Sequence, residues 1–304
     1  MYQQHFGFKK PPFEDRIAQE GEIFIGAKQR AALANLKISL GTRDAVVVLT
    51  GPIGVGKTTL GSHALRTTTT RLALAWIGMA PLTSHELLEQ LLTEFGFNPY
   101  KCSRVERLQM WRQFLNEMSM TETRVGILLD KTETFGIDVL QSLESLTAET
   151  PNGCPGANVI LTGGSALREV LQAPELESLR QRIRLSLTLD ALSPDELQAF
   201  LEYKVGAAGG DAGALFAPGA IPMLQRYSQG CIRVVKNLCE TALTMAAVRK
   251  EQQLTAKLIM QVAVGVLGME RPETDASPSP ETGASPSIAQ LESEIGRASC
   301  RERV

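Results

Sequence analysis

Residues 45–59 read AVVVLTGPIGVGKTT, and this stretch decides the fold. Its first six residues form a β-branched run typical of a buried parallel strand, and helix-compatible residues begin in the stretch that follows. The segment therefore predicts a strand, a loop and a helix in succession. The glycines Gly51, Gly54 and Gly56 let the backbone curl so that successive N–H groups face one anion, and the helix N-terminus adds its partial positive charge.

The spacing GxxxxGK[ST] at residues 51–58 is the signature of a loop that holds nucleotide phosphates. It predicts ATP and Mg²⁺ as the cofactors. Lys57 is expected to reach the β- and γ-phosphates, and Thr58 is expected to ligate Mg²⁺. The predicted nucleotide-binding residues are Gly51, Pro52, Ile53, Gly54, Val55, Gly56, Lys57, Thr58 and Thr59.

A hydrophobic run at residues 125–130, VGILLD, predicts a second core strand that ends in Asp130. Phosphate-loop enzymes hold magnesium through a carboxylate at the end of a neighbouring strand, so Asp130 joins Thr58 as a predicted Mg²⁺ ligand. The next residue, Lys131, is cationic at neutral pH and cannot accept a proton from water. Glu133, two residues beyond the expected position, is the candidate stand-in for the base.

From Ser193 onward the pattern is helical. Ser193 caps a helix with Pro194 at its first position and Glu196 three residues after the cap, which is a capping-box arrangement. Three more segments have the spacing of amphipathic helices: residues 218–229, 232–249 and 255–267. The sequence therefore predicts a small helical lid after the α/β part.

Several ordered blocks between Met1 and about Leu267 resemble the ExeA/GspA type of AAA+ ATPase, which belongs to general secretion and related type II secretion or pilus-like systems. The blocks are MYQQHFGFKKPPFED at 1–15, LTGPIGVGKTTL at 49–60, VILTGGSALREVLQAPELESLRQRI at 159–183, LDALSPDEL at 189–197 and GCIRVVKNLCETAL at 230–243. The resemblance implies an AAA+ P-loop NTPase, an α/β fold with a parallel sheet flanked by helices and followed by a small all-helical lid domain. TniB- and TnsC-like AAA ATPases are related.

The chain departs from this family in its acidic block. The family usually has Asp-Glu-Ala-Gln-Asn there, whereas residues 130–134 read DKTET. Lys131 thus replaces the glutamate that polarises the attacking water. We therefore expect an ATPase that converts ATP and water to ADP and phosphate with weakened hydrolysis.

The resemblance also implies roles for residues outside the loop. Thr162, at the end of the predicted strand 159–162, would sense the γ-phosphate; one of Arg180 and Arg182 would face a neighbouring subunit's nucleotide; and the lid residue Arg233 would contact the γ-phosphate. Each residue also has a purely structural interpretation. Thr162 would be an ordinary threonine at a strand end, Arg180 and Arg182 would lie on a solvated helix face or in a surface ion pair, and Arg233 would form a structural ion pair. The predicted catalytic residues are Asp130, Glu133, Thr162, Arg180, Arg182 and Arg233.

The predicted organisation has four parts: an AAA+ α/β nucleotide-binding domain at 1–190, a helical lid at 191–269, a disordered Pro/Ser-rich linker at 270–294 and a tail at 295–304. The tail, IGRASCRERV, matches the translation of a common sequencing adapter and is predicted to be an artefact. We therefore expect the natural protein to continue beyond the linker. The resemblance implies a membrane helix and a periplasmic peptidoglycan-binding part in that position.

The composition gives general indications about the location of the protein and about its cysteines. The amino terminus lacks the apolar run of a secretory signal, and no stretch has the roughly 18 apolar residues of a membrane helix, so the chain as given is expected in the cytoplasm. The natural protein would be anchored in the inner membrane through its further part. Five scattered cysteines without a CxxC pair indicate neither a disulfide framework nor a zinc site.

The function expected is an ATP-driven switch or assembly factor for an envelope machine, acting as a homo-oligomer with a membrane or envelope partner. One alternative is a DNA-transposition regulator of the TniB or TnsC type, and another is a hydrolysis-deficient ATP-binding scaffold. A net charge of -2 and a pI near 6.0 give no global drive toward nucleic acid and favour the first function.

Overall fold

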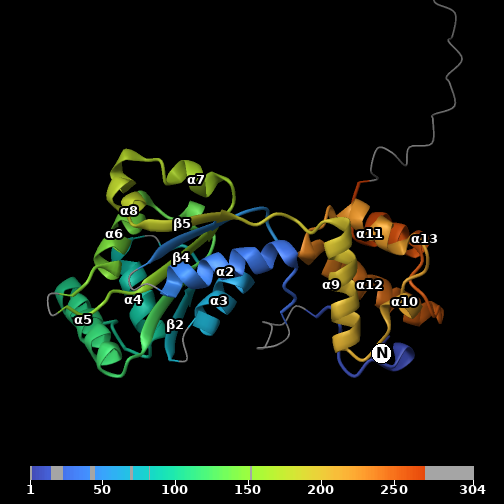
Figure 1. Cartoon of the computed structure of the whole chain (residues 1–304), viewed down its shortest axis with the longest axis horizontal. Helices are drawn as coiled ribbons and strands as arrows, with labels where there is room; N and C mark the ends of the chain where they lie inside the picture. The colour runs from blue at the N-terminus through green and yellow to red at the C-terminus, as the bar shows by residue number, and fades with distance from the viewer. Residues whose placement is uncertain are drawn as a thin grey trace, which may run out of the picture.

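The computed structural model of the chain describes residues 2–14, 23–41, 45–68, 71–81, 83–150 and 153–270. The predicted linker beyond residue 270 and the predicted artefact at residues 295–304 lie outside the described residues. Figure 1 shows an α/β lobe and a helical lobe connected by extended chain.

A five-stranded parallel sheet with the order β2-β3-β4-β1-β5 forms the centre of the α/β lobe. Its strands are β1 (Val46–Thr50), β2 (Leu72–Ile77), β3 (Arg124–Leu129), β4 (Asn158–Gly163) and β5 (Ile183–Thr188). The predicted parallel α/β sheet is confirmed, and strands are present at each of the three places where they were expected. Because the strands run parallel, the C-terminal ends of β1, β3 and β4 meet at one edge.

Helices cover both faces of the sheet. They are α2 (Ala27–Gly41), α3 (Lys57–Thr68), α4 (Ser84–Glu94), α5 (Arg104–Met120), α6 (Ile137–Thr147), α7 (Ala166–Val170) and α8 (Glu177–Gln181), with 3-10 turns η1 (Thr132–Thr134) and η2 (Pro174–Leu176). Alternate strand residues enter different cores: Val47 and Leu128 pack with α2 and α3, whereas Val48 packs on the opposite side with α4, α5 and α6. Burial on both faces explains the unbroken apolar sequence of β1.

The helical lobe contains α9 (Pro194–Ala207), α10 (Ala212–Leu215), α11 (Ala220–Ser228), α12 (Ile232–Arg249) and α13 (Ala256–Gln261), followed by the π-helical turn η3 (Val262–Val266). The predicted capping box is confirmed: Glu196 N donates to Ser193 Oγ at 3.3 Å, and Ser193 N donates to Glu196 Oε2 at 3.1 Å. Among the helices of the described residues, none reaches the length and apolar character that a membrane crossing requires.

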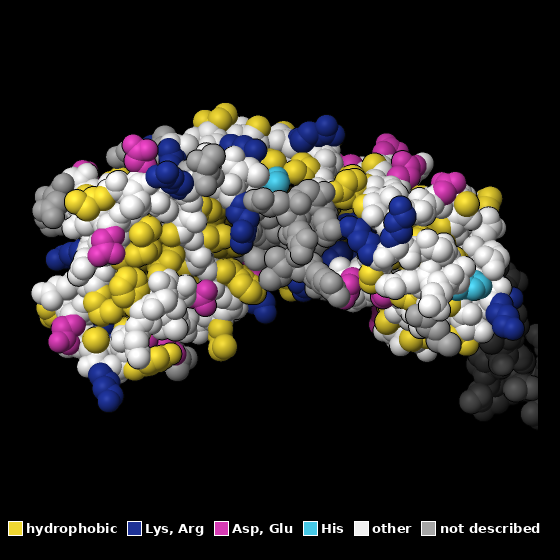
Figure 2. Space-filling model, turned by 90° about the horizontal axis from the view of Figure 1, so that it is seen from below, with side chains coloured by type: hydrophobic (Ala, Val, Ile, Leu, Met, Phe, Trp, Pro, Cys, Tyr) yellow, Lys and Arg dark blue, Asp and Glu magenta, His cyan; other side chains and the backbone are white. Residues whose placement is uncertain are grey.

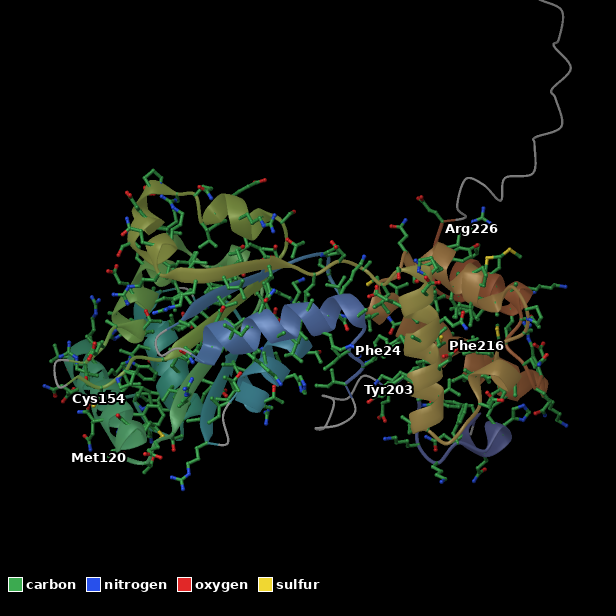
Figure 3. All side chains as sticks on the ribbon, viewed as in Figure 1. Phe24, Met120, Cys154, Tyr203, Phe216 and Arg226 are labelled. Atoms are coloured by element: carbon green, nitrogen blue, oxygen red, sulfur yellow. The ribbon has the colours of Figure 1, made fainter. Side chains whose placement is uncertain are left out.

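The opening of the chain packs against the helical lobe. Phe8 and Phe13 are buried in the helical core, and α1 (Tyr2–Phe6) contacts α12. Figure 3 shows Phe24 beside Tyr203 of α9, with ring centroids 5.8 Å apart. This packing differs from the expectation that residues 1–190 form one domain around the sheet. The aromatic residues of the opening need a core, and the sequence pattern does not specify which core receives them.

Candidate nucleotide-binding and hydrolysis site

The phosphate loop connects β1 to α3, which begins at Lys57, so the predicted succession of strand, loop and helix is confirmed. Gly51 and Gly54 have φ values of 149° and 83°, a region that residues with a Cβ rarely adopt. Space is a second constraint at Gly54, because a Cβ there would lie 2.8 Å from both Arg233 Cβ and Cys231 Sγ. The loop therefore needs glycine at this position for its curvature and for its contact with the helical lobe.

Lys57 is buried, and its ammonium nitrogen lies inside the loop. Nζ donates to Gly51 O at 2.9 Å and to Pro52 O at 2.8 Å. Burial lowers the pKa of Lys57 below its ordinary value, although the charges of Asp130 and Glu133 act in the opposite direction. A buried cation whose direct partners are neutral carbonyls is poorly compensated. An anionic phosphate would supply the missing charge, so the residues of the loop fit a nucleotide.

The ends of β3 and β4 bring Asp130 and Thr162 together. Thr162 is fully buried, and its Oγ1 donates to Asp130 Oδ1 at 2.6 Å. The backbone N–H of Lys131 donates to the same oxygen at 3.0 Å. Among the described residues, no hydrogen bond or ion pair engages Asp130 Oδ2. This oxygen fits the predicted magnesium role of Asp130, which stays a prediction; the described part of the chain has no cluster of three or more His, Cys, Asp or Glu that could hold a metal without the nucleotide.

Lys131 and Glu133 lie in different environments. Lys131 is exposed and has a left-handed backbone with φ 53°, and within the described ranges its ammonium group forms no ion pair with Asp130. Glu133 is half-buried in η1, where Oε1 accepts a hydrogen bond from Gly164 N at 3.0 Å. The position that replaces the usual glutamate therefore offers no acceptor, whereas a carboxylate lies two residues further along.

The first turn of α12 contacts the tip of the phosphate loop. Arg233 N donates to Gly54 O at 3.1 Å, and Cys231 Sγ donates to Ile53 O at 3.2 Å. The positive charge of Arg233 also contributes to the lowered pKa of Lys57. A contact between Arg233 and the γ-phosphate stays a prediction. Sequence reasoning missed the contact made by Cys231. Its place two residues before Arg233 was the only available signal.

Arg180 and Arg182 lie apart from the loop. Arg180 Nη1 donates to Leu171 O at 3.1 Å, and Arg182 Nη1 lies 3.4 Å from Glu144 O and 3.3 Å from Thr147 Oγ1. Both guanidinium groups are thus held by atoms of their own α/β lobe. A role for either residue at a neighbouring subunit's nucleotide stays a prediction.

A cavity of about 880 Å³ borders the loop, a volume within the range of small-molecule sites. The loop and α3 contribute Val55, Gly56, Thr58 and Thr59 to its lining; the opening of the chain contributes Lys10, Pro12 and Phe24; and the helical lobe contributes Lys204, Ile232 and Lys236. The last two groups were not predicted as site residues. Lys10, Pro12, Ile232 and Lys236 lie in two of the blocks that resemble the family, but no spacing pattern connects these blocks with the loop, and tertiary packing brings them to the cavity.

The family model of the AAA domain matches residues 41–171. The chain is 29% identical over 271 residues to general secretion pathway protein A of Aeromonas hydrophila, a match that covers 88% of this chain and 49% of the relative. This chain has the AAA+ P-loop NTPase fold. The resemblance of this chain to the ExeA/GspA type of AAA+ ATPase is confirmed, and the chain spans about half the length of that curated relative.

Solved structures support the AAA+ fold of this chain. The ORC2 protein of Aeropyrum pernix, solved in ADPNP–ADP complexes, has a TM-score of 0.66 at 18% identity, covering 84% of this chain and 71% of that one. The Holliday junction branch migration motor RuvB of Thermotoga maritima has a TM-score of 0.54 at 17% identity, covering 81% and 71%. At such identities the likeness shows the fold alone.

Proposed function

We propose that this AAA+ protein binds ATP with Mg²⁺ and acts as an ATP-driven switch or assembly factor for an envelope machine of the type II secretion or pilus-like kind. The observation that carries the nucleotide part is Lys57, a buried cation whose hydrogen-bond partners among the described residues are two loop carbonyls. The general secretion name of the curated relative supports the envelope part.

Different residues of this chain would bind the phosphates and the Mg²⁺ ion. Backbone N–H groups of the loop and Lys57 hold the β- and γ-phosphates, and Thr58 and Asp130 hold Mg²⁺, which would neutralise charge on the phosphates. Thr162 orients Asp130 by its hydrogen bond. Hydrolysis is slow because Lys131 stands where the family has its glutamate.

ATP also drives assembly in this proposal. The nucleotide would lie between the α/β lobe and α12, and a neighbouring copy would present Arg180 or Arg182 to it. A bound phosphate offers Arg233 and the neighbour's arginine a common anionic partner, so ATP should favour the homo-oligomer. The assembled protein would work at the cytoplasmic face of the inner membrane, where ATP is available.

The transposition alternative rests on weaker ground. The likeness to the ORC and RuvB structures carries no nucleic-acid function at 17–18% identity. On the face that Figure 2 shows, Lys and Arg are scattered among Asp and Glu and do not form one stripe. A basic stripe was the feature expected of that alternative.

Isothermal calorimetry with ATP and Mg²⁺ tests the nucleotide part. Lys57→Ala should abolish or strongly weaken binding, while Lys101→Ala, which removes an exposed lysine from a loop far along the chain, should leave the affinity unchanged. Equal affinities of Lys57→Ala and the unmodified protein would show that the loop assignment is wrong. Co-purification of the intact natural protein with inner-membrane fractions tests the location.

A further inference from the structure

The sheet ends at β2, and this edge strand consists of apolar residues. Its sequence over Leu72–Ile77 is LALAWI. The strand at the opposite edge, β5, carries the charged Arg184 and packs against α2. Native proteins usually protect a sheet edge with charged residues or proline, because an unprotected edge pairs readily with another strand. The strand β2 has neither, so another segment of protein is expected to cover its edge.

Alternate residues of β2 turn their backbone groups away from the sheet. Arg124 N donates to Arg71 O at 3.0 Å, and Asp130 N donates to Ile77 O at 2.9 Å, so the odd-numbered residues face β3. In a parallel ladder the residues between them face the other way. Their N–H and C=O groups lie on the open side, where no group of the described residues bonds them. These residues are Leu72, Leu74 and Trp76.

The side chains of the same residues lie on the face of the sheet that α3 covers. Leu72 and Leu74 pack partly against the core beneath α2 and α3, whereas Ile77 enters the opposite core. Trp76 alternates with Ile77, and 47% of its surface is exposed. Figure 2 views the molecule from below, the side on which Figure 1 shows β2, and hydrophobic side chains gather there on the α/β lobe. An apolar surface therefore adjoins the open backbone edge.

Helix α3 forms a wall beside this edge. The cavity that borders the phosphate loop also includes Leu74 and Trp76 in its lining. The α3 residues that line it have the spacing of one helix face and are Thr59, Ser62, His63 and Arg66. A strand as long as β2 extends about 20 Å. The edge and the helix thus border a groove with the length and the backbone groups for one extended peptide.

Arg66 gives this groove a basic wall. Its side chain is exposed, Nε donates to Ser62 Oγ at 3.4 Å, and among the described residues no ion pair engages its guanidinium group. The acidic residue that lines the cavity near β2, Glu94, comes from α4 and not from α3. A second copy joined through the same edge would bring two α3 walls together, which like charges disfavour. A peptide with an acidic residue complements the wall instead.

We propose that the edge of β2 binds an extended acidic peptide segment of another protein, which adds a sixth strand to the five-stranded sheet. Main-chain hydrogen bonds to the open edge supply affinity, and alternate side chains of the peptide supply specificity. Its apolar side chains pack on Leu74 and Trp76, and its acidic side chain reaches Arg66. This docking does not depend on ATP hydrolysis, so its test is separate from that of the proposed function.

The test uses the full chain and a synthetic hexapeptide in which threonine alternates with valine, valine and glutamate. In NMR-detected hydrogen exchange, millimolar peptide should protect the amides of Leu72, Leu74 and Trp76. It should also reduce acrylamide quenching of tryptophan fluorescence, since Trp76 is half-exposed and the second tryptophan, Trp111, is buried. Absence of protection at millimolar peptide overturns the inference.

Modified peptides test the strand pairing and the charge. N-methylation of one alternate set of peptide residues should abolish binding, whereas N-methylation of the other set should preserve it. Lysine in place of the glutamate should weaken binding about two- to fivefold, the range of an exposed ion pair, and Arg66→Glu should reverse this preference. Equal effects of the two methylated peptides, or a preference that Arg66→Glu leaves unchanged, overturn the inference.

Variants of the edge strand provide the complementary test. Trp76→Ala should weaken peptide binding about tenfold or more, as expected of a central aromatic contact, whereas Tyr100→Ala, at an exposed aromatic residue outside the groove, should have no effect. Leu74→Pro removes an outward N–H without removing a bond to β3, and it should also weaken binding. Urea unfolding midpoints show that the variants are folded. Unchanged affinity of Trp76→Ala and Leu74→Pro overturns the inference.

Sedimentation at increasing protein concentration tests the other occupant of the edge. The free chain should show no dimer that depends on β2. If it dimerises and Leu74→Pro abolishes the dimer, the edge binds a second copy, and the peptide proposal is wrong.

Discussion

The Thr162 hydroxyl donates a hydrogen bond of 2.6 Å to Asp130 Oδ1 and so connects the ends of two neighbouring strands, β4 and β3. The bond involves a charged acceptor, which makes it stronger than one between neutral groups. Among the described residues, it leaves Asp130 Oδ2 as the carboxylate oxygen without a hydrogen bond. The sensor residue and the metal residue predicted from sequence are thus one unit.

Removing this bond should affect both stability and turnover. Thr162→Val keeps the volume of the side chain but leaves Asp130 Oδ1 with one donor fewer, so the free energy of unfolding should fall by about 1–3 kcal/mol. Turnover should also fall because Asp130 loses its fixed orientation. Thr93→Val, at an exposed position of α4, is the matched control. Urea unfolding measures the effect on stability, and phosphate release measures the effect on turnover. If Thr162→Val equals the unmodified protein in both, Thr162 does not act together with Asp130.

The contact between the phosphate loop and α12 gives a second prediction. Gly54→Ala places a Cβ at φ 83° and only 2.8 Å from Arg233 Cβ, so the loop and the helical lobe must move apart. ATP affinity should drop at least tenfold, as measured by calorimetry. Gly206→Ala adds the same methyl group inside α9, where helix propensity predicts a gain in stability of up to about 1 kcal/mol and no change in affinity. Unaltered ATP affinity of Gly54→Ala would mean that the loop tolerates the displacement.

The opening of the chain can be tested through Tyr2. Its hydroxyl donates to Glu240 Oε1 at 2.6 Å, and Glu240 Oε2 is buried without a partner among the described residues. Tyr2→Phe would leave both oxygens unpaired and should lower the free energy of unfolding by about 1–3 kcal/mol near neutral pH. Differential scanning calorimetry or urea titration at pH 7 measures the loss.

The pH dependence of this effect has a defined sign. Burial and the neighbouring Glu240 raise the pKa of Tyr2 above its ordinary value of 10.0. The stabilisation is therefore fully present below about pH 10 and is lost as the pH rises toward the pKa of the folded state, since the unfolded chain ionises first. The difference between the unmodified protein and Tyr2→Phe should narrow above pH 10. A difference that stays constant or grows there would show that ionisation of Tyr2 is not coupled to folding.

Local patterns in the sequence predicted the features that are themselves local. The phosphate loop has its glycines, its lysine and its flanking strand and helix within one short segment, so spacing alone identified it. The capping box at Ser193 is equally local, and the structure has both of its hydrogen bonds. The strand ending in Asp130 was recognisable because a buried parallel strand is an unbroken apolar run.

Contacts between distant segments could not be predicted in this way. Cys231 bonds Ile53 across 178 residues, and no spacing rule connects the two positions. The surroundings of Glu133 depend on Gly163 and Gly164 of the next strand, so the sequence could offer this residue only as a candidate. The opening of the chain was assigned to the sheet lobe by its order in the sequence, whereas its aromatic residues pack in the helical core.

Lys131 stands where the family has a glutamate, and a change at this position tests whether a base is missing there or is supplied by Glu133. Lys131→Glu restores a proton acceptor directly after Asp130, at a position whose backbone is left-handed with φ 53°. Because positioning of a general base typically contributes about 10²- to 10⁴-fold, turnover should rise by a sizeable part of that range while ATP affinity stays similar. Lys250→Glu is the matched control, since Lys250 is also exposed and left-handed, with φ 58°, and lies at the end of α12.

Combining this change with Glu133→Gln distinguishes a relocated base from an absent one. If Glu133 is the base of the natural chain, Glu133→Gln should cost much less in the Lys131→Glu background, because the restored glutamate takes over the proton. The two effects would then be strongly non-additive, with each tenfold of coupling corresponding to about 1.4 kcal/mol. Single-turnover phosphate release from the four proteins of this double-mutant cycle gives the coupling directly. Equal losses in both backgrounds would contradict a shared task, and Glu133 would then have to act by positioning another group. If Lys131→Glu raises turnover and Glu133→Gln does not lower it, the natural chain has no effective base. It would then be an ATP-responsive switch with strongly reduced hydrolysis.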